Sequence, residues 1–236
     1  MEETNSTPKS KRWYWKGLKI VALAGGSLLA ALYVVHICWV LSGSGRWEFV
    51  GEKNGVKVYS LKAPGSELEQ VKGVVRVHST LSGLVAFMQD PDICSDLGCH
   101  DARMLERVDD RVQYSSARFD FPFPFRTREL VVRTQTYQNP HTKEVLMWVS
   151  AVPDRIPPNP CCVRLTNLNN TWRYTSLGDG EVEVEHVENV NEGGFVGLLF
   201  TNRGLRDLMY DGLPRVQNIV SRPKYQNAKV DFIEEQ

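Results

Sequence analysis

Cysteine and histidine are the residues of this 236-residue chain with the most distinctive chemistry, and each occurs five times. Four of the cysteines form two close pairs in the sequence, Cys94 with Cys99 and Cys161 with Cys162. An even number permits two disulfides in three connectivities, which suits a compartment outside the reducing cytoplasm. Because a bridge between adjacent residues is strained, we predict a bridge from Cys161 or Cys162 to Cys94 or Cys99.

Metal-binding and catalytic motifs are weak in this sequence. Cys94, Cys99 and His100 reach only the outer limit of zinc-ligand spacing, and no second pair stands at a matching distance, so we predict no metal. The sequence has no glycine-rich phosphate loop, no HExxH and no GxSxG, so we expect neither a cofactor nor an enzyme. An acid–base pair of Arg164 and His186 keeps an enzymatic alternative open.

Two predicted strands place polar side chains on the same face as apolar ones. Alternation puts Arg164 and Asn170 on one side of the segment 164–174, and it puts His186 on the apolar side of the segment 181–190. A solid core seldom contains such residues, because each needs a buried partner. A cavity that holds a ligand with one polar end accounts for them. The alternative is that they pair with one another or lie at strand ends.

The segment 119–125, FDFPFPF, has the most unusual composition in the chain. Its two prolines prevent continued strand pairing, so we predict a loop. A loop rarely exposes four phenylalanines to water, so the rings either cap the core or close a pocket and touch a membrane or partner.

Residues 1–43 have the composition of a membrane anchor. The segment 20–41 lacks Asp, Glu, Lys and Arg, and as a helix its 22 residues can cross a ~30 Å hydrocarbon core. The run is longer than the ~7–15 apolar residues of a signal peptide, although cleavage near 42–44 is the alternative. Five basic residues precede it, so the positive-inside rule predicts a cytoplasmic N-terminus and a body, residues 44–236, on the opposite side.

The composition of the whole chain is that of a globular protein. It is 42% hydrophobic and 24% charged, which excludes disordered, collagen-like and many-pass membrane chains. The 28 basic and 28 acidic side chains give no net charge, which argues against nucleic acid as a partner.

The body is predicted to be mainly β-structure closed by one long helix. Residues 80–90 have apolar side chains at helical spacing, and so do residues 195–220, which Pro214 interrupts. Turn residues separate the predicted strands, which cover 46–61 (two strands around Gly55), 68–78, 102–108, 111–119, 128–137, 144–152, 162–176 and 181–190.

Five segments occur in the order found in START lipid-transfer domains: NGVKVYS, DARMLERVDD, VQYSSARFDFPFPFRTRELVV, CVRL followed by WRYTSLGDG, and VNEGGFVGLLFTNRGL. On these segments, residues 46 to about 222 resemble a START domain. The resemblance implies an α+β helix-grip fold, in which a curved antiparallel sheet wraps around the C-terminal helix and leaves a lipid-sized tunnel. A tryptophan common in the family before the fourth strand is replaced here by 95–99, so the ligand cannot be transferred from a relative.

The resemblance implies that the chain binds a lipid or sterol-like hydrophobic ligand and transfers or presents it at a membrane. The predicted ligand-binding residues are Tyr114, Ser116, Arg118, Arg164, Asn170, Trp172 and His186. The resemblance also implies that the phenylalanine loop and the C-terminal helix form the gate, for which the predicted residues are Phe121, Phe123, Phe125, Phe195, Leu198 and Leu199. Two alternatives are a cyclase- or hydratase-like enzyme of the same superfamily and a ligand-gated interaction or sensor protein.

Overall fold

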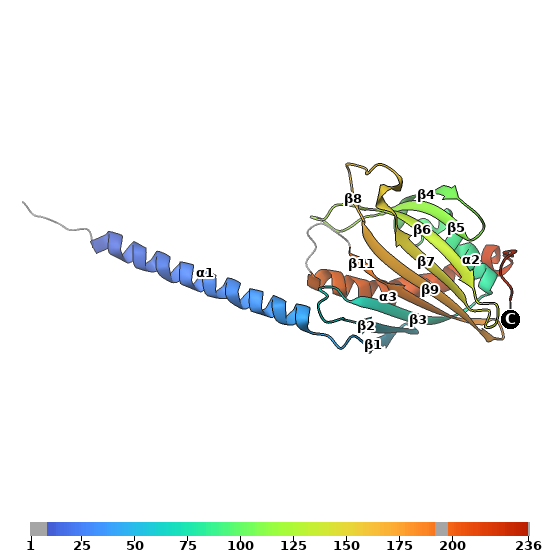
Figure 1. The fold of residues 1–236 in the computed structure, drawn as a ribbon, viewed down its shortest axis with the longest axis horizontal. Coiled ribbons are helices and arrows are strands. Elements are labelled where there is room, and N and C mark those ends of the chain that lie inside the picture. The colour runs from blue at the N-terminus through green and yellow to red at the C-terminus, as the bar shows by residue number, and fades with distance from the viewer. Residues whose placement is uncertain (1–8, 192–197, 236) are drawn as a thin grey trace, which may run out of the picture.

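A computed structural model describes residues 9–191 and 198–235 of the chain. The first element is a 33-residue helix, α1 (Lys9–Leu41), which projects away from the body (Figure 1). Its segment Trp15–Leu41 is long and apolar enough to cross a membrane. The strands of the body begin at Trp47, shortly after the helix ends.

The body is built on one large antiparallel sheet. Its strands are β1 (Trp47–Lys53), β2 (Val56–Leu61), β3 (Gln70–His78), β4 (Cys99–Arg107), β5 (Val112–Phe119), β6 (Arg128–Gln138), β7 (Val145–Ala151), β8 (Val163–Arg164), β9 (Asn167–Gly178), β10 (Glu181–Glu188) and β11 (Val190–Asn191). The main order is β1-β2-β3-β10-β9-β7-β6-β5-β4. The short β11 pairs with β9, and β8 runs parallel to the start of β6.

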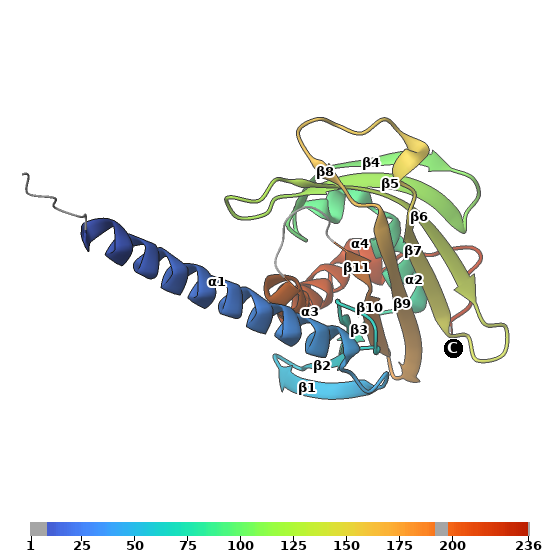
Figure 2. The same cartoon turned by 60° about the vertical axis from the view of Figure 1, so that its left-hand side comes forward.

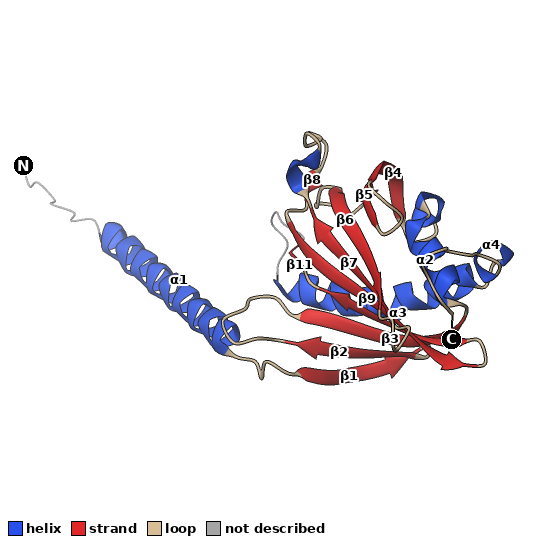
Figure 3. Cartoon of the chain, turned by 45° about the vertical axis from the view of Figure 1, so that its right-hand side comes forward, coloured by secondary structure: helices blue, strands red, loops and turns tan. Residues whose placement is uncertain are grey.

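The helices of the body lie inside the curve of this sheet (Figure 3). They are α2 (Leu81–Gln89), α3 (Leu198–Val220) and α4 (Pro223–Gln226), with short 3-10 helices at Pro91–Cys94 and Pro153–Arg155. Thr80 begins α2, and its side-chain oxygen accepts a hydrogen bond from the Gly83 N–H at 2.9 Å. Phe87 of α2 meets Tyr225 of α4 edge to face, with ring centroids 6.0 Å apart.

Helix α3 packs along β2 and β3 through an apolar stripe. Its buried residues include Leu205, Met209, Leu213 and Val216. A Cβ atom added to Gly73 of β3 would lie 2.4 Å from Leu213 Cδ1, so only glycine permits this approach. The expected arrangement, a curved antiparallel sheet around a long C-terminal helix, is confirmed.

The strand register gathers specific loops at one end of the sheet, which we call the anchor end. It is defined by the β2–β3 loop (62–69) and the β5–β6 loop (120–127). Gln70, the first residue of β3, pairs with the last residue of β2. The next residue, Val71, pairs with Glu188, so the last residue of β10 lies at the same end of the sheet. Through β9 and β7 this end continues to Arg128, which begins β6 opposite Phe119. The turns β6–β7 and β9–β10 lie at the opposite, far end.

Candidate ligand-binding site

The inner face of the sheet is the face that meets α3, and the register identifies its residues. Gly73 touches α3 and pairs with His186, which pairs with Trp172 on β9. Trp172 pairs with Met147, and Met147 pairs with Thr136. Paired residues point to the same side of a sheet, so this row lies on the inner face. Asn170, two residues from Trp172 on β9, shares that face.

Two of the predicted ligand residues already have polar partners on the inner face. The His186 ring stacks on Trp172, and its Nε2 lies 2.7 Å from Glu188 Oε2. Its Nδ1 lies 3.3 Å from the Thr171 carbonyl oxygen. Asn170 Oδ1 accepts a hydrogen bond from the Asn189 N–H at 3.0 Å. The polar atoms of His186 and Asn170 named here therefore already have hydrogen-bond partners on β9, on β10 or directly after β10.

Two other inner-face oxygens lack partners among the residues that the structure describes: Gln113 Oε1 and the Tyr174 hydroxyl. Gln113 is 5% exposed and pairs with Thr134, whereas Tyr174 is completely buried on β9. Burial raises the pKa of the Tyr174 phenol, so the group stays neutral. A buried polar atom without a partner costs about 1–3 kcal/mol. A ligand with an uncharged polar group would remove that cost.

Side chains do not completely cover the inner face of β5, β6, β7 and β9. Partly accessible residues there are Ser115, Leu130, Val149, Ala151 and Trp172. On α3, Leu208 is 48% exposed and lies between the two glycines Gly204 and Gly212. Because α3 packs mainly on β2 and β3, this part of the interior presents accessible apolar surface. It is the part of the fold best suited to hold hydrocarbon.

Charged groups at the anchor end of the inner face pair with each other. Glu69 is buried, and a carboxylate oxygen accepts a hydrogen bond from the Arg206 guanidinium. The Glu69 N–H donates to Asn202 Oδ1 at 3.2 Å. Arg206 Nε has no partner in the described part of the chain. One donor is therefore left where α3 meets the end of the sheet.

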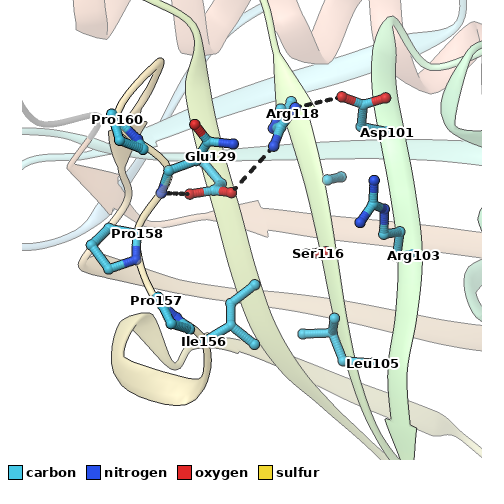
Figure 4. A pocket seen from close by; sticks show the side chains of 12 residues that line it. Asp101, Arg103, Leu105, Ser116, Arg118, Glu129, Ile156, Pro157, Pro158 and Pro160 are labelled. Carbon is cyan, nitrogen blue, oxygen red and sulfur yellow. Dashed lines mark hydrogen bonds and ion pairs between the residues drawn. The ribbon is translucent and has the colours of Figure 1, made fainter.

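The outer face of β4, β5 and β6 has a different character. A pocket of about 330 Å³ lies there under the loop 156–160, and Figure 4 shows its charged residues. Arg118 lies 2.6 Å from Asp101 Oδ2 and 3.8 Å from Glu129 Oε1. Arg164 donates to Glu129 Oε2 from Nε and Nη2, at 3.0 and 2.8 Å. It also donates to the carbonyl oxygens of three loop residues, Pro153, Ile156 and Pro157.

Four predicted ligand residues lie on this outer face, so their assignment to the interior is wrong. On β5, Tyr114, Ser116 and Arg118 have the opposite parity to Gln113. Arg164 lies on β8, where it pairs with Glu129 of β6 and not with a residue of β9. Arg155 covers the Tyr114 ring at 4.2 Å. The proposed acid–base pair of Arg164 and His186 is therefore not formed.

The buried ion pair of Arg164 and Glu129 fixes the covering loop to the sheet. Both side chains are at most 8% exposed. Burial tends to raise the pKa of Glu129, but hydrogen bonds from Arg164 and the Asn159 N–H, with the charges of Arg164 and Arg118, hold that pKa below its usual range. The sequence analysis correctly predicted that the Arg164 side chain is buried. It was wrong about the reason, because Arg164 pairs with Glu129 and not with a ligand.

Sequence analysis missed Gln113, and the reason lies in the pattern of β5. Residues 112–119 read VQYSSARF, in which neither alternate set is clearly apolar. Parity alone could not tell the inner face from the outer one. The signal that could have helped is Leu130 and Val132 on β6, whose partners Ala117 and Ser115 share the parity of Gln113.

The phenylalanine loop is exposed at its tip. Phe123 is 96% exposed, whereas Phe121 and Phe125 are partly buried. The Arg128 guanidinium lies 4.6 Å from the Phe121 ring centroid. Arg126 ties the end of the loop to carbonyl oxygens of the turn 160–162. Of the other predicted gate residues, Phe195 lies outside the described residues, as do the side chains of Leu198 and Leu199, so gating by them stays a prediction.

The cysteines form two local bridges, Cys94–Cys99 and Cys161–Cys162. The predicted bridge between the two regions is therefore wrong. The turn 95–98 brings the Cα atoms of Cys94 and Cys99 to 4.9 Å, whereas Cys161 and Cys162 lie beside Arg126 in the loop on the outer face. Within the described residues, no group of three potential metal ligands comes together.

Comparison with known proteins identifies the fold. No protein-family model matches the sequence, and no curated protein matches it either. Among solved structures, a STAR-related lipid transfer protein from Xanthomonas axonopodis superposes with a TM-score of 0.70 at 20% identity, covering 76% of this chain and 100% of that chain. The lipid transfer and protein localization domain of human StarD13 gives 0.68 at 15% identity, covering 76% and 91%.

A third structure extends the likeness over more of the chain. Human StAR-related lipid transfer protein 5 gives a TM-score of 0.64 at 15% identity, covering 83% of this chain and 95% of that chain. Together with the sheet order and the position of α3, these likenesses show that the body has the START helix-grip fold.

Proposed function

We propose that this chain is a membrane-anchored lipid carrier that holds one hydrophobic ligand between the inner face of its sheet and α3. The fold is shared with proteins whose names describe lipid transfer. The observation that carries the proposal is that two buried oxygens, of Gln113 on β5 and of Tyr174 on β9, lack partners in the described part of the chain, on an inner face that also presents accessible apolar side chains. A lipid supplies both the hydrocarbon and the polar group that this surface lacks.

The ligand's polar group is expected to be uncharged. Gln113 and Tyr174 are neutral, and so is Thr134, which pairs with Gln113 on β6. Two buried carboxylates already have cationic partners: Glu129 pairs with Arg164 on the outer face, and Glu69 pairs with Arg206 at the anchor end. An alcohol or an ester, as in a sterol or a neutral glyceride, fits such a setting better than an anionic head group, which would be buried without a counter-ion.

The polar group of the ligand lies deep in this arrangement. Gln113 is six residues from Phe119, so it stands roughly 20 Å along β5 from the anchor end, at ~3.3 Å per residue. A ligand that enters at the anchor end therefore leads with its polar group. Through Thr134 and Val149, Asn170 lies level with Gln113 in the strand register, and Trp172 and His186 lie one inward-facing position farther from the anchor end.

The membrane part of the proposal assigns α1 as a retained single-span anchor. Its basic N-terminal flank favours a cytoplasmic N-terminus and a body on the opposite side of the membrane. The two local disulfides suit that side. The exposed Phe123 at the tip of the β5–β6 loop would meet the bilayer when a ligand enters or leaves.

Mass spectrometry of co-purified lipid tests this function. The full-length protein is extracted in mild detergent, and bound lipid is identified and quantified. We expect about one neutral lipid per chain, and less in a Gln113→Leu variant. Gln135→Leu is the matched control, because Gln135 is on β6 with the opposite parity to Thr134, on the outer face. Recovery of no lipid from either the wild-type protein or the control would contradict the proposal.

A further inference from the structure

The last two turns of α1 are held against the body by one face of the helix. Residues 15–35 of the helix are exposed, but His36, Trp39 and Val40 are partly shielded. These three positions follow helical spacing, so they form one stripe. The stripe meets the β2–β3 loop: Trp39 Nε1 donates to the Glu67 carbonyl oxygen at 2.9 Å, and His36 Nε2 lies 3.4 Å from Glu67 Oε1.

Lys62 adds a positive charge at the C-terminal end of α1. The helix has no basic residue in its last turn, and its final carbonyl groups have no partners inside the helix. The Lys62 ammonium donates to the carbonyl oxygens of Val40 at 3.4 Å, Ser42 at 3.0 Å and Ser66 at 2.8 Å. It also lies 4.8 Å from the Trp39 ring centroid. A positive charge at this position favours the negative end of the helix dipole.

Two glycines permit this close approach. The Gly65 N–H donates to the Val40 carbonyl oxygen at 2.8 Å. Gly43 has a φ of +113°, and a Cβ atom there would lie 2.3 Å from the Lys62 carbonyl oxygen. The Gly45 N–H donates to that same oxygen at 3.0 Å. The link between α1 and the body is therefore a bonded turn rather than a free tether.

The docked helix leaves from the anchor end of the sheet, where the phenylalanine loop also lies. Both α1 and the β5–β6 loop project from the same side of the body in two views (Figures 1 and 2). The apolar segment Trp15–Leu41 has 27 residues, or ~40 Å of helix, whereas a hydrocarbon core is ~30 Å thick. The last turns can therefore emerge at head-group depth, which places their contacts with the β2–β3 loop in the same layer.

We propose that Lys62, Gly65 and Glu67 dock α1 rigidly, so that the anchor end of the sheet is held against the bilayer that contains α1. The occupant of this surface is the phospholipid leaflet in which α1 ends, and Phe123 enters it. This inference rests on the proposed membrane anchoring. It adds that the carrier has one fixed orientation, in which it exchanges ligand with its own membrane and does not swing out on a flexible linker.

Chemical cross-linking tests the docking. Full-length protein with Cys38→Ser, His36→Cys and Glu67→Cys is reconstituted in phosphatidylcholine vesicles and treated with a short bis-maleimide. These substitutions remove the His36–Glu67 ion pair but keep the hydrogen bonds of Lys62 and Trp39, which are made to backbone carbonyl oxygens. We expect efficient internal cross-linking, and a roughly tenfold slower reaction after Lys62→Ala, the equivalent of one charge-assisted hydrogen bond. Lys57→Ala, on the exposed side of β2, is the control and should not change the rate. Equal rates in all three proteins would overturn the docking.

Depth-dependent quenching tests the orientation. A bimane label is placed at Phe123→Cys or, as a far-end control, at Leu177→Cys beside the β9–β10 turn, both in the Cys38→Ser background. Nitroxide phospholipids in the same vesicles should quench the label at 123 at least about fivefold more than the label at 177. Adding Lys62→Ala with Gly43→Val should reduce this difference. Equal quenching at the two positions, or a difference that the added substitutions leave unchanged, would overturn the orientation.

Neither experiment requires a bound ligand. A protein that cross-links and quenches as expected but carries no lipid would retain the docking and contradict the proposed carrier function. A protein that carries lipid but shows equal quenching at 123 and 177 would do the reverse.

Discussion

The two faces of the sheet carry polar groups of different kinds. On the outer face, Arg118, Glu129 and Arg164 are charged, and each has a partner within the molecule. On the inner face, Gln113 and Tyr174 are neutral, and each leaves one buried oxygen without a partner. A paired charge holds structure together, whereas an unpaired neutral oxygen beside open apolar surface suits a ligand.

This difference teaches that burial alone does not identify a ligand-binding residue. The Arg164 side chain is only 8% exposed, and in the sequence Arg164 was a more conspicuous polar residue than Gln113. The structure uses it to fasten the loop 156–160 to the outer face. Completeness of hydrogen bonding separates the two roles, and substitutions on the two faces should therefore have different consequences.

The largest effect is expected from Arg164→Leu. It leaves the Glu129 carboxylate buried without its main partner, which typically costs 3–5 kcal/mol, so we expect a loss of about 4 kcal/mol in the free energy of unfolding. Denaturant unfolding measures this loss. The matched control Arg103→Leu, an exposed arginine at the same pocket, should change it by less than about 1 kcal/mol. If the variant bound a different lipid and had unchanged stability, Arg164 would be a ligand-binding residue and the proposed difference between the two faces would be wrong.

The phenylalanine loop should show the next largest effect, on kinetics. Phe123→Ser removes an exposed ring whose burial in a bilayer is worth about 1.5–3 kcal/mol, so lipid exchange should slow by about tenfold or more. Stability should change by less than about 0.5 kcal/mol, because the ring packs on little in the folded protein. The measurement is the exchange of labelled lipid between vesicles. A wild-type rate in the variant would show that this loop does not control entry and exit of the ligand.

Gln113→Leu sharpens the assignment of the inner face. The substitution removes the unpartnered oxygen, so the protein should be as stable as the wild type or slightly more stable, while affinity for the ligand falls about tenfold. Competition with a fluorescent neutral lipid measures the affinity. If the ligand bound with wild-type affinity, the polar end of the ligand would have to lie elsewhere.

The smallest effect is the dependence of stability on acid. The pKa of Glu129 is below its ordinary value of about 4.3 in the folded protein, so its contribution is complete above that pH. The contribution is lost as the pH falls through the lowered pKa, because the folded state must then take up a proton that breaks the Arg164 pair. Thermal unfolding from pH 7 to 3 should show this acid limb, and Arg164→Leu should flatten it. An equally steep limb in the variant would assign it to other carboxylates, such as Asp90.

The sequence contained enough information to predict the fold and only part of the site. Alternation in 181–190 predicted the inward face of β10 correctly. Spacing in 195–220 predicted the buried positions of α3 from Leu205 onward, except that Leu208 is 48% exposed. The site depends on parity in β5 and on which strand Arg164 joins, and both are set by pairing between residues far apart in the chain. The prediction of the disulfide pairing was wrong for the same reason, because the pairing depends on how far apart the two cysteine-containing loops lie in the folded protein.

A photoactivatable lipid tests the central claim most directly. The full-length protein, loaded with a neutral lipid that carries a diazirine near its polar group, is irradiated and digested, and the labelled residues are mapped by mass spectrometry. The account predicts labels on the inner face, at Gln113, Ser115 or Tyr174, and none on Ser116, Arg118 or Ile156 of the outer pocket. Labels concentrated in the outer pocket, with the inner face unlabelled, would contradict it.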